Sequence, residues 1–476
     1  MKEISFKNFR RFSDFPAIEF GDLNLLVGAN NSGKSTAIKA ALLTLKNILR
    51  INLDNEPPLE SFSFLNDLEA HTHFGDFLSN LPKGSQDKTM EFCILLSNYR
   101  IKFYLNGSSI EKGRPALSVP LKRLEIWDIG RDCILTYDNT SNPCTKSFSF
   151  SKNSIKNQAK YISIGIDVIH NIDAIDCAPE DYITVTLNDI KKDNIYRSYF
   201  PIRSPYEISD DKHLFTSDSL YLLNSVFSQM FLLLRDDFAS FYDFVEYIET
   251  HCASHNEVLY ENDRNNYLAR TVAQFENAYI TSDDKAYSFI KKWLTNFNIG
   301  NDFKITRPFA EVLKVDILTN NYSTPLGSLG TGSIQLFILL LRIAIAIKNG
   351  NRVIFFIEEP EQNLHPAFQS KLADLFHEAI HISHERIQFV IETHSEYLVR
   401  RTQVIVAEGV QKASSGESPH TDIDFWNHRF KVYYFPENDF PYSMDYRSNG
   451  QFEHPFGAGF YDEAGKNYRA LLKLSI

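Results

Sequence analysis

The chain has 476 residues and a mass of 54.8 kDa, which suggests two or three structural units at roughly 150 residues per domain. Hydrophobic residues make up 43% of it and charged residues 23%, so it can bury a globular core and is neither a disordered nor a fibrous chain. The net charge of -11 and the pI near 5.7 argue against a general nucleic-acid binder of the histone type.

Five widely spaced cysteines, an odd number in a long chain, are typical of a reducing compartment, and we expect a cytoplasmic protein. The N-terminus alternates from its first residues, so we expect no signal peptide. The longest apolar run, Leu336 to Ile347, is too short for a bilayer and carries Arg342 at its centre. The sequence therefore predicts no transmembrane helix and no membrane partner.

In chain order, residues 4–9, 17–20 and 23–27 read as three short strands, and a helix follows from Ser35 to near Ile48. Apolar runs between 91 and 151 are separated by turn residues, which predicts an antiparallel sheet. From Ser217 to Asn298 apolar residues recur at intervals of three and four, which predicts helices. No heptad pattern persists there, so we expect no long coiled coil.

From Phe303 two strand-like runs lead to a glycine-rich turn and an apolar helix that ends near Ile347. A buried strand at 353–357, a helix at 366–380 and a second strand at 387–391 follow. This alternation of strand and helix predicts an α/β fold.

The segment Gly28 to Thr36 reads GANNSGKST and satisfies G-x-x-x-x-G-K-[ST] between a buried strand and a helix. Such a loop turns its backbone amides toward phosphate oxygens at a helix N-terminus. Lys34 would reach the β- and γ-phosphates, and the Ser35 hydroxyl would bind Mg²⁺. We expect a surface turn held by backbone geometry, so that loss of Lys34 spares the fold. The candidate nucleotide-binding residues are Gly28, Asn30, Asn31, Ser32, Gly33, Lys34, Ser35 and Thr36.

Three further segments follow the phosphate loop in a fixed order. Glu358 and Glu359 end an apolar strand, and strand alternation predicts that they point to opposite sides. Glu358 would hold Mg²⁺ through water, and Glu359 would polarise an attacking water. Gly332 and Ser333 open a helix whose N-terminus suits a phosphate. His394 ends another strand and can donate to a γ-phosphate oxygen.

The order of GANNSGKST, LGTGSIQ, FFIEEPEQNLHP and IETHSE resembles the ATP-binding-cassette ATPases of the RecF and SMC type, and in particular the stand-alone members of prokaryotic anti-phage systems such as the Septu, retron-associated and PARIS ATPases. The resemblance implies a head-to-tail dimer that holds two ATPs, each between one phosphate loop and the other subunit's Gly332 and Ser333. It implies Glu358 as the magnesium acid, Glu359 as the general base, Asn363 to His365 as a dimer-contact loop and His394 as the switch histidine.

The resemblance divides the chain into residues 1–50 as the N-terminal part of the ATPase lobe, 51–216 as a β-rich part of the head or of an insertion, 217–302 as a helical insertion and 303–476 as the C-terminal ATPase lobe. The sequence departs from the usual pattern of these families at two positions, where Gly330 replaces the signature serine and Glu358 replaces the magnesium aspartate. These replacements imply slow hydrolysis. The resemblance favours the ATPase subunit of an anti-phage complex that scaffolds and controls a separate nuclease or toxin, with nucleic acid reached through that partner. The rival hypothesis is a RecF-like repair ATPase that engages DNA directly.

A third hypothesis is a self-contained nuclease. Val404 to Gly409, with Asp422 and Asp424, superficially fits a nuclease of the topoisomerase-primase type. Too few residues follow for a complete nuclease lobe, and we interpret Val404 to Gly409 as a late strand of the ATPase lobe. The segment His251 to His255 could look like half a zinc site, but it lacks a second Cys/His pair. We interpret it as the surface of an insertion helix.

Overall fold

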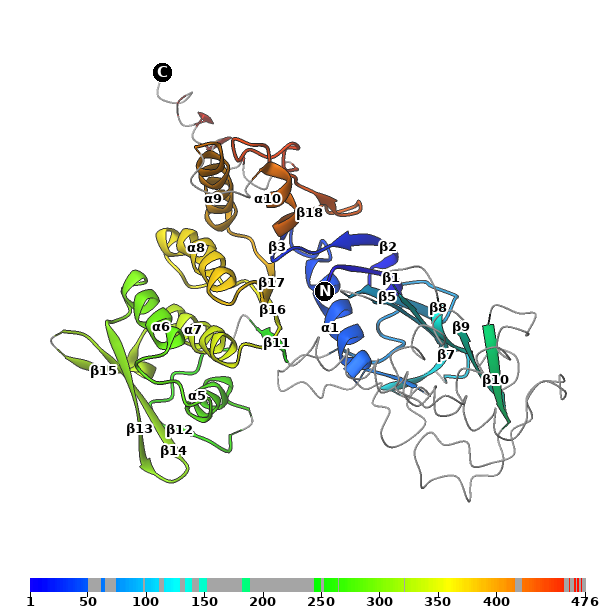
Figure 1. Cartoon of the computed structure of the whole chain (residues 1–476), viewed down its shortest axis with the longest axis horizontal. Coiled ribbons are helices and arrows are strands. Elements are labelled where there is room, and N and C mark those ends of the chain that lie inside the picture. Colours follow the sequence, from blue (N-terminus) through cyan, green and yellow to red (C-terminus); the bar gives the residue numbers. More distant parts are fainter. Residues whose placement is uncertain are drawn as a thin grey trace, which may run out of the picture. The chain divides into compact units, whose positions relative to one another are not determined.

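The structure, a computed structural model, describes residues 1–49, 61–64, 74–96, 99–110, 115–128, 133–138, 145–151, 182–188, 244–249, 252–263, 265–320, 322–415, 422–457, 462, 466–467, 469–470 and 472. The chain divides into two compact units (Figure 1). Unit 1 comprises Met1–Glu19, Lys39–Leu65 and His73–Phe241, and unit 2 comprises Phe20–Ile38, Asn66–Thr72 and Tyr242–Ile476.

Unit 1 is built on a nine-stranded antiparallel sheet in the order β10-β9-β8-β7-β6-β5-β1-β2, with β4 paired to β7. Alternate residues of β1 are buried, and the Phe6 ring stacks on Phe15 at 4.3 Å between centroids. The antiparallel sheet predicted for residues 91–151 is confirmed, and it includes the two N-terminal strands. The strands are β1 (Glu3–Phe9), β2 (Phe12–Glu19), β4 (Ser61–Ser63), β5 (Thr89–Leu95), β6 (Tyr99–Asn106), β7 (Ser118–Asp128), β8 (Cys133–Asp138), β9 (Thr145–Ser151) and β10 (Tyr182–Asn188).

The main sheet of unit 2 has the order β11-β16-β17-β3-β18-β19, and all neighbours are parallel except β19. Its central strands are almost continuously apolar, as parallel strands covered on both faces must be. The buried amide of Asn24 is satisfied because its Nδ2 donates to the carbonyls of Gly21 and Phe389 at 2.9 and 2.7 Å. The strands are β3 (Leu23–Gly28), β11 (Phe244–Ile248), β16 (Val353–Glu358), β17 (Ile387–Glu392), β18 (Phe430–Phe435) and β19 (Tyr442–Ser443).

A smaller antiparallel sheet in unit 2 has the order β12-β14-β13, and β15 also pairs with β14. Two helices lie between β12 and β13 in the chain, whereas β13, β14 and β15 follow one another directly. The division between the units falls within the first helix, Lys34–Leu49. The small sheet contains β12 (Leu259–Tyr260), β13 (Asp302–Phe309), β14 (Val312–Leu318) and β15 (Ser323–Pro325). The helices are α1 (Lys34–Leu49), α5 (Tyr267–Asn277), α6 (Lys285–Asn296), a short 3₁₀ turn (Leu326–Ser328), α7 (Thr331–Asn349), α8 (Pro366–Ile382), α9 (Glu396–Ser414) and α10 (Ile423–Arg429).

Helix α7 is the apolar core helix of unit 2. Its length and a mean hydropathy of 1.7 would allow a membrane span, yet 67% of that window is buried inside the protein. Arg342 at its centre is buried, with its guanidinium 4.8 Å from the centroid of the Tyr267 ring and its Nε donating to Thr271 Oγ1 at 3.0 Å. These contacts on α5, together with the ion pair to Glu246 of β11 at 3.4 Å, satisfy the buried charge.

The α/β class is confirmed, and the described helices include no long coiled coil, since the longest, α7 and α9, have 19 residues each. The prediction of a wholly helical stretch over 217–302 is wrong at Phe244–Ile248, because β11 pairs in parallel with β16. Short runs of aromatic and aliphatic residues fit both the helical and the strand periodicity. Residues 217–243 lie outside the described residues. The division into four segments stays a prediction.

The interpretation of Val404 to Gly409 as a strand is also wrong, because these residues lie within α9. Ser395 is the N-cap of this helix, and its Oγ accepts a hydrogen bond from the Leu398 amide at 3.2 Å. Glu408 forms an ion pair with Arg401 at 3.7 Å, and Asp422 caps α10. The residues proposed for a nuclease are therefore helix caps and helix surface.

Candidate functional site

The phosphate loop begins where β3 ends, at Gly28, and ends where α1 begins, at Lys34. Gly28 has φ +142°, and a Cβ there would lie 2.2 Å from the Phe435 carbonyl oxygen of β18. Gly33 has φ +105°, a conformation that glycine adopts readily. The first turn of α1 contains no acidic residue, so its amides and the positive end of the helix dipole are not offset by a carboxylate there.

The polar residues of the loop differ in exposure. Asn30 and Asn31 are exposed, whereas Ser35 is half-buried and Thr36 is buried. The Ser32 hydroxyl is buried and has no hydrogen-bond partner. A buried hydroxyl without a partner is costly unless a ligand supplies one. This atom and the acid-free helix start fit a bound phosphate group.

Lys34 is not the surface cation expected from the sequence, because only 2% of it is exposed. Its Nζ donates to the carbonyls of Gly28 and Ala29 at 3.1 and 2.8 Å, and lies 3.8 Å from Glu392 Oε1. Burial lowers the pKa of this ammonium, while the neighbouring carboxylates oppose the shift. The lysine therefore contributes to the folded loop as well as to phosphate binding.

Glu392 forms an ion pair with Lys34 of the phosphate loop, and the sequence analysis missed it as a site residue. It ends β17, opposite Glu358 in the parallel register, and only 6% of it is exposed. Burial raises its pKa to about 7, against the opposing effects of the Ser35 hydroxyl and of Lys34. A signal was present, because Glu392 follows an apolar strand just as Glu358 does. The sequence did not show that β17 lies beside β3, the strand that leads into the phosphate loop.

Glu358 and Glu359 make different contacts, and Glu359 lies beyond the end of the strand, so strand alternation does not describe its side chain. Strand β16 ends at Glu358, and Glu359 takes a left-handed backbone with φ +46°. Glu358 interacts with Tyr247 on β11, since burial and this carboxylate raise the pKa of the phenol. Glu359 instead accepts a hydrogen bond from Gln362 Nε2 at 3.1 Å. The two carboxylates therefore have different hydrogen-bond partners.

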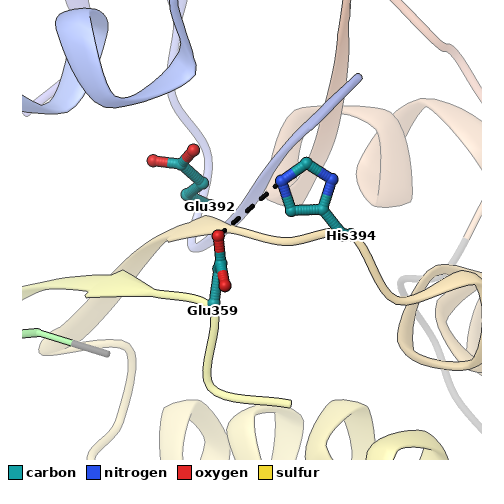
Figure 2. A group of neighbouring side chains, drawn as sticks. All are labelled: Glu359, Glu392 and His394. Carbon is teal, nitrogen blue, oxygen red and sulfur yellow. Dashed lines mark ion pairs between the residues drawn. The ribbon is translucent and has the colours of Figure 1, made fainter. Parts of the chain in front are cut away.

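His394 follows β17 and lies beside Glu359, with 3.8 Å between its Nε2 and Glu359 Oε1. Its backbone amide donates to Glu361 Oε1 at 2.6 Å, and burial raises the pKa of the Glu361 carboxyl. Burial, aided by Lys34, lowers the pKa of the His394 imidazole. Figure 2 shows Glu359, Glu392 and His394 as neighbours, from the loop after β16 and from the end of β17.

The predicted signature residues open α7, with Gly330 as its N-cap. A Cβ on Gly332 would lie 2.5 Å from the Asn363 carbonyl oxygen, so this glycine permits close packing against the loop after β16. The amide of Ser333 donates to the Gly330 carbonyl at 2.9 Å. Among the contacts of the described residues, none joins Ser333 to the phosphate loop of the same chain.

A second residue that sequence reasoning misjudged supports the signature turn. His255 lies in a loop and not on an insertion helix. Its Nδ1 lies 3.2 Å from the Gly327 carbonyl oxygen and its Nε2 lies 3.0 Å from Thr331 Oγ1. The ring therefore positions the start of α7, and both of its nitrogens are engaged. His251 lies outside the described residues.

The structure thus brings Lys34, Ser35, Glu359, Glu392 and His394 together within unit 2, at the carboxyl ends of parallel strands. Ligands bind at this edge of open α/β sheets. The helix N-terminus suits phosphates, and the buried carboxylates suit a divalent cation. The half-exposed Glu359 and His394 can take and give a proton.

Comparison with known proteins identifies a family. Residues 1–399 match the family model described as an AAA ATPase domain, and no curated protein matches the chain.

Solved structures with similarity to the chain include three heads of SMC proteins. One is an Smc head bound to the C-winged helix domain of ScpA, with 14% identity, a TM-score of 0.41 and coverage of 93% of this chain and 97% of that chain. Another is an Smc head with an extended coiled coil bound to the C-terminal domain of ScpA derived from Pyrococcus furiosus, with 13% identity, a TM-score of 0.38 and coverage of 100% and 99%. The SMC head from Thermotoga maritima has 12% identity, a TM-score of 0.33 and coverage of 84% and 91%. Scores this low carry no argument about activity or partners.

Proposed function

The chain belongs to the family of AAA ATPase domains, and on that premise we propose that it binds and hydrolyses Mg²⁺-ATP between two copies of itself. We also propose that the nucleotide state of this dimer controls a separate nuclease or toxin in a cytoplasmic anti-phage complex. The observation that carries the ATPase proposal is the meeting of the phosphate loop with Glu359 and His394 at one edge of the unit 2 sheet. The motif order carries the defence role.

Nucleotide binding is supported by the acid-free start of α1 and the buried, unpartnered Ser32 hydroxyl. Lys34 would exchange the carbonyls of Gly28 and Ala29 for the β- and γ-phosphates, and its charge would offset theirs. Ser35, with Glu358 through water, would hold Mg²⁺, which neutralises charge on the phosphate oxygens.

Glu359 is the candidate general base, because a half-exposed carboxylate beside the phosphate loop can accept a proton from water. Gln362 fixes one of its oxygens at 3.1 Å, and the other faces His394. His394 can donate from Nε2 to a γ-phosphate oxygen. The buried Glu361 holds the backbone of His394 and so limits where the ring can lie.

The second half of each site would come from the other subunit. In this chain the start of α7 is engaged by His255 and by the loop at Asn363, and not by its own phosphate loop. Its amides and its acid-free first turn suit a phosphate supplied in trans. Binding of ATP at such an interface would tie dimerisation to nucleotide, which is the switch that a separate effector could read.

Two variants test the ATPase. Glu359→Gln removes only proton-accepting power, so we expect ATP to bind without turnover and the mass by light scattering to rise from one chain, 54.8 kDa, to two. Lys34→Ala should neither bind ATP nor dimerise. Glu396→Gln, on the exposed start of α9, is the matched control and should behave as wild type. Normal hydrolysis by Glu359→Gln would refute the proposal.

The trans arrangement is tested by mixing two inactive variants. Ser333 is preferable to Gly332 for the signature lesion, because Gly332 packs against its own chain. In a mixed dimer of Ser333→Arg and Lys34→Ala, one site carries both lesions and the other carries neither. We expect about half of the activity per mixed dimer to return. No recovery, although mixed dimers form, would contradict a trans site.

The effector is tested by purification with the products of the neighbouring genes. We expect a nuclease or toxin to copurify and plasmid DNA to stay intact with this chain alone in Mg²⁺ and ATP. DNA binding by the isolated chain with no copurifying effector would favour the repair ATPase instead.

A further inference from the structure

The site contains a cluster of three side chains with potential metal-ligand atoms, those of Glu359, Glu392 and His394. One ligand atom from each of these three side chains lies within 4.8 Å of the other two. Ligand atoms on opposite sides of a transition ion are about 4.2 Å apart when each bond is about 2.1 Å long. Adjacent ligand atoms are closer, at roughly 3–3.4 Å, so side-chain movements on the order of an ångström would place all three side chains around one ion.

Glu392 supplies an independent observation. It is more than nine-tenths buried, and its Oε2 has no hydrogen-bond partner. Lys34 lies 3.8 Å from the other oxygen, Oε1, and is itself bound to two carbonyls of the phosphate loop. A buried carboxylate oxygen without a donor is costly, and a cation is the group that would satisfy it.

The local charge points the same way. Glu358, Glu359, Glu361 and Glu392 act electrostatically on one another or on Lys34, which is the ammonium in their midst. Four carboxylates around one ammonium leave an excess of negative charge. In a partly desolvated site this excess attracts a divalent cation more strongly than it would in water.

We propose that Glu359, Glu392 and His394 bind a divalent transition ion, Mn²⁺ or Zn²⁺, in the nucleotide-free chain. The imidazole nitrogen favours such ions over Mg²⁺, which prefers oxygen ligands. This ion is distinct from the magnesium proposed at Ser35 and Glu358, which arrives with the nucleotide. The functional consequence rests on the proposed ATPase: an ion on Glu359 occupies the general base and inhibits hydrolysis.

Mn²⁺ alone is the probe that tests the site. Chain freed of metal and nucleotide is titrated with Mn²⁺ while electron paramagnetic resonance follows the free ion, and pulsed measurements detect coupling to nitrogen. We expect one Mn²⁺ per chain with the nitrogen coupling of one imidazole. His394→Asn should remove that coupling, and Glu392→Gln should weaken binding by more than about tenfold.

Two controls separate this site from its alternatives. Glu358→Gln should keep both the Mn²⁺ and its nitrogen coupling, and the exposed Glu396→Gln should match wild type. Circular dichroism shows whether each variant is folded, and the wild-type nitrogen signal is informative even if Glu392→Gln unfolds. Absence of Mn²⁺ binding in wild type, or bound Mn²⁺ without nitrogen coupling, would overturn the proposal.

The titration contains no ATP, so its outcome is independent of the ATPase proposal. Mn²⁺ bound with nitrogen coupling in a chain that never hydrolyses ATP would keep the ion site and reject the ATPase. Hydrolysis of ATP by a chain that binds no Mn²⁺ would keep the ATPase proposal and reject the ion site.

Discussion

Gly332 offers the sharpest test of how the signature helix and the loop after β16 pack together. A Cβ at this position would lie 2.5 Å from the Asn363 carbonyl oxygen and 2.9 Å from Leu364 Cδ2, whereas ordinary contact begins near 3.4 Å. The nearest obstacle is backbone, which cannot rotate away as a side chain can. Gly332→Ala must therefore push the loop and the helix apart by up to about 0.9 Å.

The magnitude follows from two opposing effects. Overpacking of this kind costs about 1–3 kcal/mol, and alanine in place of glycine in a helix returns about 0.5–1 kcal/mol. We expect a net loss of about 1–2 kcal/mol in the free energy of unfolding. For a unit of this size that corresponds to a fall in Tm of roughly 2–4 °C. Hydrolysis should fall further than ATP binding, because Glu359 opens the same loop.

Calorimetry of the nucleotide-free variant, followed by a hydrolysis assay at saturating ATP, checks both effects. The matched control is Gly330→Ser, because a Cβ there meets nothing within 4 Å and the backbone has φ -63°. Serine at this N-cap should leave stability unchanged or raise it slightly. If Gly332→Ala unfolds at the wild-type temperature, or if Gly330→Ser loses as much stability, the close approach described here is incorrect.

Lys34→Ala should abolish ATP binding in titration calorimetry and also lower the stability of the nucleotide-free chain by about 1–2 kcal/mol, because it leaves Glu392 buried without its cation. An unchanged Tm would contradict these buried contacts. Asn24→Ala should cost about 2–4 kcal/mol in urea denaturation, since it strands the buried backbone groups that the amide satisfies; a cost below 1 kcal/mol would contradict that network. Burial lowers the pKa of His377 from its ordinary 6.5 to about 4, so the unfolded chain takes up this proton first and stability should fall by up to about 3 kcal/mol as the pH drops from 6.5 to 4. His377→Gln should flatten that part of the Tm profile, and an equally steep profile in the variant would show that other groups cause it.

Local patterns in the sequence predict the α/β class and the phosphate loop because both depend on short stretches of chain. Short apolar runs at Val353 to Ile357 and, broken only by Gln388, at Ile387 to Ile391 favour interior strands between helices. The loop from Gly28 to Lys34 places its glycines where the backbone needs positive φ. Such features do not depend on which distant segment lies beside them.

The predictions from sequence are wrong where pairing between distant segments determines the local structure. Phe244 to Ile248 fits a helical window, and its pairing with β16, more than 100 residues later, makes it a strand. Val404 to Gly409 fits a strand, but the cap at Ser395 and the packing of α9 make it a helix. Glu392 was missed for the same reason, since its role comes from strand neighbours and not from spacing in the sequence.

The position of β3 in its sheet has a consequence for synthesis of the protein. Leu25 pairs with Ile391 on one side and with Val432 on the other, so the strand that leads into the phosphate loop has no partner until nearly the whole chain exists. At roughly 5–20 residues per second, the ribosome needs about 20–80 s to supply both neighbours. During that time the apolar segment Leu23 to Val27 lacks both of its strand partners and is exposed to pairing with other nascent chains. A message truncated before the codon for Phe430 would yield a chain whose nucleotide-binding strand is a permanent open edge.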